Sequence, residues 1–149
     1  MRIILILMIF LTFESIAVDL DKLQGTWAGH QKNGHEYFHH ILEIDNKGKG
    51  FYAISIGDSY LEGWIFPVDL SGKKLVDGHV TLNLRSVNPN VNTNQVLILS
   101  PHGMYKELGV LTINLLEDGS PFHSLGWSLV KTEANLGTNG LYKFAKSAL

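Results

Sequence analysis

Short apolar stretches recur along most of the chain, and clusters of Gly, Asn, Asp and Ser separate them. Within the stretches, apolar and polar residues tend to alternate, and β-branched and aromatic side chains are frequent, which is typical of antiparallel strands. We expect eight strands, namely Leu23–Gln31, Glu36–Asp45, Gly50–Ile56, Leu61–Val68, Val80–Val87, Gln95–Leu99, Leu108–Leu116 and Ser124–Lys131. This pattern predicts an all-β fold, a single antiparallel meander barrel of about eight strands.

Alternation also assigns inward faces to the expected strands, because successive side chains of a strand point to opposite sides. The inward sets are Leu23, Gly25, Trp27 and Gly29; Phe38, His40, Leu42 and Ile44; Val80, Leu82 and Leu84; Leu111, Ile113 and Leu115; and Leu125, Trp127 and Leu129. The fourth strand is ambiguous, with Trp64, Phe66 and Val68 against Leu61, Ile65 and Pro67. Strands that are apolar on both faces predict an additional covering element.

Four other segments break the strand spacing. Lys74–Val76 is long enough only for a short ninth strand or a bulge. Residues 88–94 and 100–106 form longer connections, which on a rigid scaffold often bind partners. Apolar residues at helical spacing in Leu141–Leu149 predict a short C-terminal helix or tail, and these residues are Leu141, Phe144, Ala145 and Ala148.

The N-terminal residues 1–17 have the composition of a secretory signal peptide. Arg2 precedes an apolar run from Ile3 to Phe13, and Ser15-Ile16-Ala17 is a small-x-small cleavage site. The run is much shorter than the ~20 apolar residues of a membrane-spanning helix. We therefore expect a mature single domain, residues 18–149, that is secreted or periplasmic.

Composition excludes several functional classes. The chain has no cysteine, so disulfides, metal thiolates and cysteine nucleophiles are excluded. The formal net charge is −2 and the basic residues are scattered, which argues against a nucleic-acid partner. No phosphate loop or serine-hydrolase elbow is present, and we expect no cofactor.

His35-Glu36-Tyr37-Phe38-His39 matches the zinc-protease motif H-E-x-x-H. That chemistry requires a helix, because both histidines must then face one zinc ion. The surrounding residues instead predict a strand, on which residues four apart are ~13 Å apart, too far for two zinc bonds of ~2.1 Å. We therefore interpret the match as fortuitous and expect Glu36 to point away from both histidines.

The chain has seven histidines, and a metal site could be assembled across strands. His30 and His39, on the neighbouring first and second strands, form one such pair. A histidine-based, metal-dependent hydrolase therefore stays open as an alternative, although such sites need three or four converging ligands.

The segment Leu23-Gln24-Gly25-Thr26-Trp27-Ala28-Gly29 resembles the Gly-x-Trp motif that opens lipocalins and related calycin barrels, and also the start of some bacterial secreted barrels. In lipocalins an arginine of the last strand stacks on this tryptophan; here the last strand contains Trp127 and Lys131 instead. The resemblance implies that Trp27 plugs one end of the barrel.

The sequence thus favours a non-enzymatic binding protein for a small apolar or amphipathic ligand. We expect the ligand to approach from the end opposite Trp27, with Trp64, His40 and Arg85 as candidate contacts. A protein-recognition or inhibitor module that acts through the two longer connections is the second alternative.

Overall fold

The computed structural model describes residues 16–17, 20–57, 59–76, 79–88, 94–100, 110–117, 125–132 and 136–149. Its elements are β1 (Ile16–Ala17), α1 (Leu20–Leu23), β2 (Gly25–Asn33), β3 (Glu36–Ile44), β4 (Lys49–Ile56), β5 (Ser59–Asp69), β6 (Lys74–Leu75), β7 (Val80–Arg85), β8 (Asn94–Ser100), β9 (Val110–Glu117), β10 (Leu125–Thr132), a 3-10 turn (Leu136–Thr138) and α2 (Gly140–Ala148). The eight long strands and the C-terminal helix correspond to the elements that the sequence predicts.

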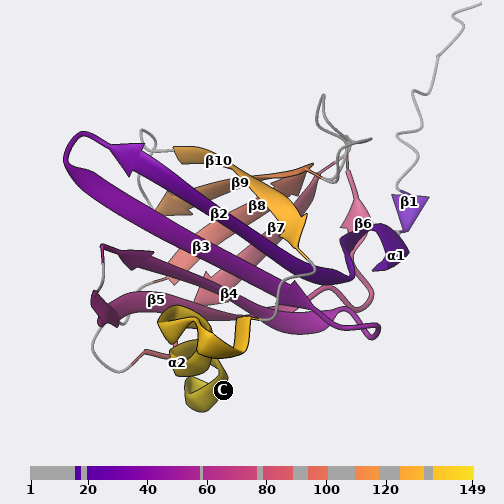
Figure 1. Ribbon diagram of the computed structural model, residues 1–149. Helices are drawn as coiled ribbons and strands as arrows, with labels where there is room; N and C mark the ends of the chain where they lie inside the picture. The colour runs from indigo at the N-terminus through magenta and orange to yellow at the C-terminus, as the bar shows by residue number, and fades with distance from the viewer. Residues whose placement is uncertain are drawn as a thin grey trace, which may run out of the picture.

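The long strands form one antiparallel sheet in the order β5-β4-β3-β2-β10-β9-β8-β7. Neighbours in the sheet are joined as hairpins, except at the centre, where the first long strand β2 pairs with the last strand β10. The sheet curls so that β7–β10 lie behind β2–β5 (Figure 1). The residues that follow β7 also bond to the other edge strand, because the Val87 amide donates to the Ile65 carbonyl of β5 at 2.8 Å.

The inner face of β2–β5 is built as successive rows of side chains that run across the strands. One row consists of Gly25, Ile44, Gly50 and Val68; the next consists of Trp27, Leu42, Tyr52 and Phe66; the third consists of Gly29, His40, Ile54 and Trp64. Phe38, paired with Gln31 and Ile56, belongs to a fourth row, about 13 Å along the strand from the Trp27 row. This assigns Trp64, Phe66 and Val68 to the inner face, which resolves the ambiguity of the fourth predicted strand.

Helix α2 covers the outer face of the same strands (Figure 1). Leu141 and Ala145 are buried against the outward side chains Ile41, Phe51 and Ile65. Most of β4 is consequently buried on both faces. The structure thereby confirms the expectation that strands with two apolar faces require a covering element.

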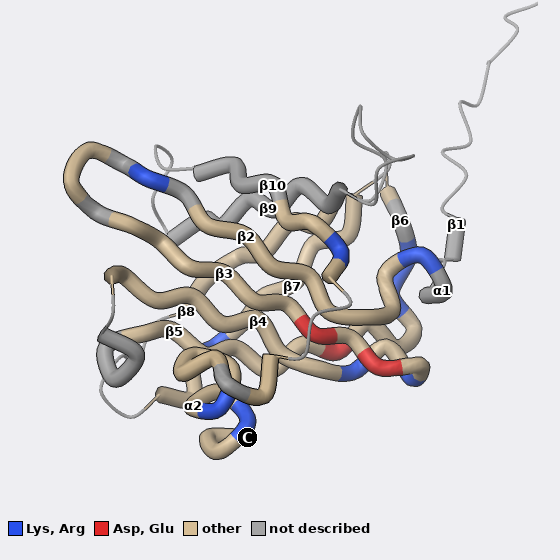
Figure 2. Tube along the Cα trace, in the orientation of Figure 1, with Lys and Arg blue, Asp and Glu red and all other residues tan. Residues whose placement is uncertain are grey.

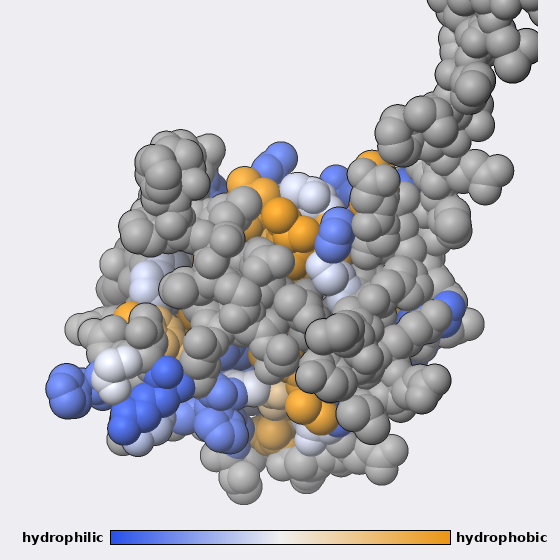
Figure 3. Space-filling view, turned by 90° about the horizontal axis from the view of Figure 1, so that it is seen from above, coloured by the Kyte–Doolittle hydropathy of each residue, from blue (hydrophilic) through white to orange (hydrophobic). Residues whose placement is uncertain are grey.

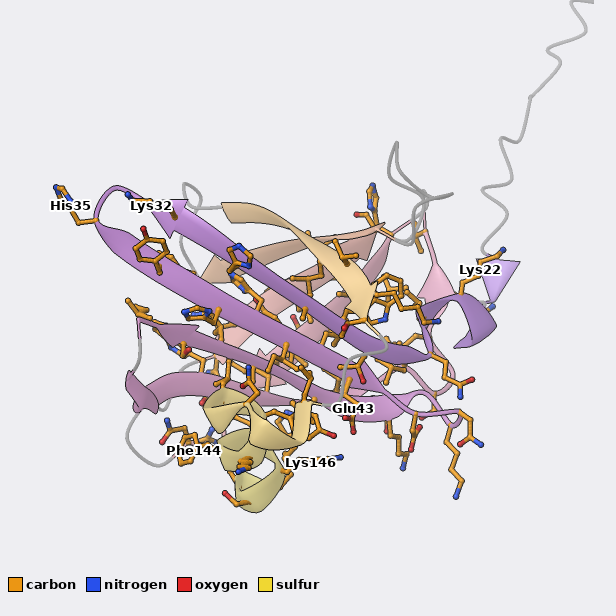
Figure 4. The ribbon with its side chains drawn as sticks, viewed as in Figure 1. Lys22, Lys32, His35, Glu43, Phe144 and Lys146 are labelled. Carbon is orange, nitrogen blue, oxygen red and sulfur yellow. The ribbon has the colours of Figure 1, made fainter. Side chains whose placement is uncertain are left out.

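A charged contact between β3 and α2 stabilises the helix at the edge of this apolar interface. The Glu43 carboxylate accepts a hydrogen bond from the Tyr142 hydroxyl at 2.6 Å and pairs with the Lys146 ammonium at 2.5 Å. Figure 4 shows Glu43 on β3 lying beside Lys146 of α2. The hydrogen bond to Glu43 raises the pKa of Tyr142 and is also the main cause of the raised pKa of Lys146. The neutral phenol of Tyr142 and the charged ammonium of Lys146 are therefore the forms that bind Glu43 and stabilise the docked helix.

Acidic residues gather near the end of β3 and β4 where Glu43 lies (Figure 2). Asp45 and Asp69 lie in or next to the turns at this end. The backbone amides of Lys49 and Lys47 donate to Asp45, and the hydroxyl and backbone amide of Ser71 donate to Asp69; these hydrogen bonds lower the pKa of each carboxyl group. Within the part of the chain that the structure describes, no helix has the length and hydrophobicity needed to cross a bilayer.

Several details differ from the sequence prediction. Leu23 ends the short helix α1 and does not begin a strand, because its carbonyl serves as a hydrogen-bond acceptor for Trp27. The short ninth strand exists as β6, and it pairs with β1, whose two residues are the last two of the predicted signal peptide. Most of the two long connections, and the inward side chains of β9, lie outside the described residues.

Gly50 offers a direct test of the β3–β4 pairing. A Cβ atom at this position would lie 1.7 Å from the Glu43 carbonyl oxygen, so Gly50→Ala must push two backbones apart. We expect a loss of roughly 3 kcal/mol in the free energy of unfolding, measured by urea denaturation. Gly72→Ala is the control: a turn glycine with open space around it should lose only about 1 kcal/mol. Equal losses in the two variants would contradict the packing described here.

Candidate functional site

The structure brings two of the predicted ligand contacts, His40 and Trp64, into one inner row. His40 pairs with Ile54 across β3 and β4, and Ile54 pairs with Trp64 across β4 and β5. The two side chains therefore stand about 10 Å apart on the same face, since neighbouring strands are ~4.8 Å apart. Gly29, at the other end of this row, adds no side chain beside His40.

His40 is a buried core histidine, only 1% exposed. Its Nδ1 lies 2.8 Å from the hydroxyl of Tyr52, and the two rings are nearly parallel. Burial, together with the neighbouring His39, lowers the pKa of His40 to about 3. Burial also raises the pKa of Tyr52. Both groups are therefore neutral at physiological pH, and they form a polar pair inside an apolar interior.

The described interior is filled with side chains near Trp27 and is less tightly enclosed near Trp64. Leu42, Tyr52 and Phe66 have no solvent-accessible surface, so no water-sized space adjoins them. Phe38 and Trp64 pack against the same core but are only partly buried. The Trp64 indole N–H is nevertheless buried and has no hydrogen-bond acceptor among the described residues. Buried donors without a partner are rare, so this one marks a position where an acceptor is missing.

Trp27 lies one row further along the same inner face and is buried in the core. Its indole N–H donates to the Leu23 carbonyl at 2.9 Å, which ties α1 to the base of β2. The ammonium of Lys131, from the last strand β10, lies 5.6 Å from the centre of the Trp27 ring. Gly25 leaves room for this lysine, because a Cβ there would lie 2.7 Å from its Cε atom. Lys131 thus makes a cation–π contact with Trp27.

Arg85, the third predicted contact, is not brought together with His40 and Trp64. In β7 buried and exposed residues alternate, and Arg85 is on the exposed face, while Val80, Leu82 and Leu84 are inward as predicted. Arg85 borders a surface cleft of about 300 Å³ with Asn83 and Asn94, at the end of β7 and β8 where the connection between the two strands begins.

The histidines of the H-E-x-x-H match are not on a helix. His39 lies within β3, and His35 lies in the turn just before it, exposed at the tip of the β2–β3 hairpin (Figure 4). The helix that a zinc protease requires is therefore absent from this segment; the predicted strand conformation is confirmed for His39, whereas for His35 it is wrong, because the tight turn at Gly34 includes this residue. The direction of the Glu36 side chain lies outside the described residues.

His30 and His39 are direct cross-strand partners on the outer face of β2 and β3. Both border a cavity of about 210 Å³, whose other walls include Ile41 of β3 together with Leu136 and Asn139 from the start of the C-terminal helix. Among the described residues, no group of three or more His, Cys, Asp or Glu side chains is close enough to hold a metal ion.

Three residues that contribute to these sites have no role predicted from the sequence. Tyr52 falls within the expected strand Gly50–Ile56, but its contact with His40 depends on the registry of β3 against β4. Leu136 and Asn139 lie outside the expected strands and the expected C-terminal helix. Asn139 is in fact the N-cap of α2, since its side chain accepts a hydrogen bond from the Tyr142 amide at 3.0 Å. An asparagine directly before an amphipathic segment is a recognisable cap pattern that could have identified it.

Exposed apolar side chains on the described surface come from separate elements, and they are Tyr37, Val76, Val87, Val130 and Leu149. Seen from above, apolar atoms lie in small areas between polar ones (Figure 3).

Comparison of the chain with protein-family models, curated proteins and solved structures finds no match.

His40 makes the folded state sensitive to acid. Its folded pKa of about 3 lies below the ordinary value of 6.5, so between these pH values the unfolded chain binds more protons than the folded chain. The free energy of unfolding that neutral, buried His40 contributes is complete above pH 6.5 and is lost as the pH falls toward 3. Because each pKa unit corresponds to about 1.4 kcal/mol, we expect a loss on the order of 4 kcal/mol.

The measurement is urea denaturation at a series of pH values. His40→Gln should flatten the profile between pH 6.5 and 3, because its amide can still bond Tyr52 but does not titrate. His35→Gln, which alters an exposed histidine of the same hairpin, should retain the wild-type profile. A wild-type profile in His40→Gln would show that another group governs acid unfolding.

Proposed function

We propose that the sheet closes into a barrel and that the protein is a secreted or periplasmic carrier for a small amphipathic ligand. Closure is supported by the hydrogen bonds between β5 and the residues that follow β7. The Val87 amide bonds the Ile65 carbonyl, and the Asn88 side-chain amide bonds the Gly63 carbonyl at 2.5 Å. An eight-stranded barrel is wide enough either to be filled by side chains or to hold one small ligand.

The buried and unsatisfied N–H of Trp64 is the observation that supports this proposal best. It lies in the less enclosed part of the interior, away from the filled layer around Trp27. A bound ligand that presents an oxygen acceptor would satisfy this donor, and the partly buried ring of Phe38 would contact its apolar part. The ligand class that follows is a short aliphatic or aromatic molecule with one carbonyl, hydroxyl or carboxylate group.

The two ends of the interior would then have different roles. Trp27, held by Leu23 and Lys131, closes one end with a packed aromatic layer. The neutral pair links the two rows, since Tyr52 belongs to the Trp27 row and His40 to the Trp64 row, and it supplies a polar floor without a charge. Such a floor favours an uncharged or singly polar ligand, because a dianion would have to be desolvated without a cationic partner.

Residues 1–17 support the extracytoplasmic part of the proposal through their signal-peptide pattern. Small apolar molecules dissolve poorly in aqueous compartments, and a soluble barrel with a partly apolar interior would carry them. The resemblance of residues 23–29 to the opening motif of lipocalins agrees with this function, and membership of that class is part of the proposal.

Competition binding tests the proposal. The fluorescent probe N-phenyl-1-naphthylamine is added to the purified protein, and decanol or decanoate is titrated as the competitor. We expect saturable displacement at one site per chain. Trp64→Phe retains the aromatic ring but removes the N–H, so it should weaken decanol binding roughly fivefold, the effect of one hydrogen bond worth about 1 kcal/mol. Binding of the probe itself should change little.

Tyr37→Phe is the matched control, because it removes a polar hydrogen from an aromatic residue that is 48% exposed. It should bind decanol as the wild type does. Absence of saturable binding with every apolar probe would contradict the proposed function. Equal losses in Trp64→Phe and Tyr37→Phe would contradict the role of the indole donor.

A further inference from the structure

His30 and His39 are the only histidines that the described strand pairs place directly opposite each other. Directly opposite residues of an antiparallel pair point to the same side, and their Cβ atoms are about 4.5–5.5 Å apart. Ile41, which follows His39 by two residues and therefore shares its face, is packed against α2 on the outside of the sheet. The two imidazoles thus belong to the outer face, opposite to the proposed ligand position.

The spacing of such a pair suits a shared metal ion. Two nitrogen ligands bound to one tetrahedral ion at 2.0–2.1 Å are about 3.4 Å apart. Imidazole rings whose Cβ atoms are about 5 Å apart can reach this separation by rotation about their side-chain bonds. This geometry differs from that of residues four apart on one strand, which made the H-E-x-x-H match unsuitable.

The surroundings leave room for an ion and its remaining ligands. The cavity of about 210 Å³ borders both histidines, and its walls include Ala28, Ile41 and Leu136. A water molecule takes up about 30 Å³ in the liquid, so the space accommodates an ion with two or more waters. Asn139 also borders the cavity, and its side-chain oxygen already accepts the Tyr142 amide as the cap of α2.

We propose that His30 and His39 form a two-imidazole site for a divalent transition metal such as Cu²⁺, Ni²⁺ or Zn²⁺. The ion bridges β2 and β3 beside the start of α2, and water or a small exogenous ligand fills the remaining positions. Imidazole ligands suit these three metals, among which Cu²⁺ binds most tightly. The neutral imidazole is the ligating form, so acidification releases the metal.

The site is tested by calorimetric titration of CuCl₂ and ZnCl₂ into protein purified without a histidine tag. We expect one ion per chain in the wild type. His30→Gln and His39→Gln should each weaken binding at least about tenfold, since loss of a residue that only supports a metal ligand already costs 10–100-fold. His35→Gln is the matched control, because His35 lies on the same hairpin but at its exposed tip (Figure 4).

Electron paramagnetic resonance of the Cu²⁺ complex gives a readout that does not depend on stability. The wild type and His35→Gln should show coupling to two imidazole nitrogens, and each site variant should show one nitrogen or none. Unchanged affinity and coupling in His30→Gln and His39→Gln would overturn the proposal. Loss of binding in His35→Gln, or no binding by the wild type, would also overturn it.

Discussion

The burial of β4 on both faces is the constraint on which the rest of the structure depends. Its alternating side chains send Tyr52 and Ile54 into the interior and Phe51 and Ala53 toward α2, and all four are at most 2% exposed. A strand of this kind is stable only where the sheet curls over one face and another element covers the other. The curvature of the sheet and the docking of the C-terminal helix are therefore two consequences of one hydrophobic pattern.

Docking of the helix also creates the outer cavity. Leu136 and Asn139 reach the histidine pair only because α2 is anchored further along, by Leu141 and Ala145 in the apolar interface and by the contacts of Tyr142 and Lys146 with Glu43. The outward face of β3 makes all three contacts. Ile41 borders the cavity and packs against α2, and Glu43, two residues further along the strand, makes the charged contact with the helix. The geometry beside His30 and His39 is thus linked to the stability of the helix.

The sequence predicted the strands well, because hydrophobic alternation is a local property that tertiary structure enforces. It predicted the inward faces of β3 and β7, the covering helix and the strand conformation around His39 for the same reason. It did not predict the bond between His40 and Tyr52 or the position of Lys131 over Trp27, because each depends on the registry between strands. Arg85 shows the converse: a single charge at a strand end does not by itself reveal the face to which it belongs.

His39 and His40 show how one step along a strand changes the chemistry of the same side chain. His40 points inward, where burial keeps its ring neutral and a tyrosine hydroxyl bonds it. His39 borders an outer cavity opposite a second histidine. A slip of β3 by one residue would exchange the two environments and would also turn Leu42 and Ile44 out of the core. The hydrophobic pattern that fixes the strand registry therefore also keeps the buried pair of His40 and Tyr52 on the inner face separate from the pair of His30 and His39 on the outer face.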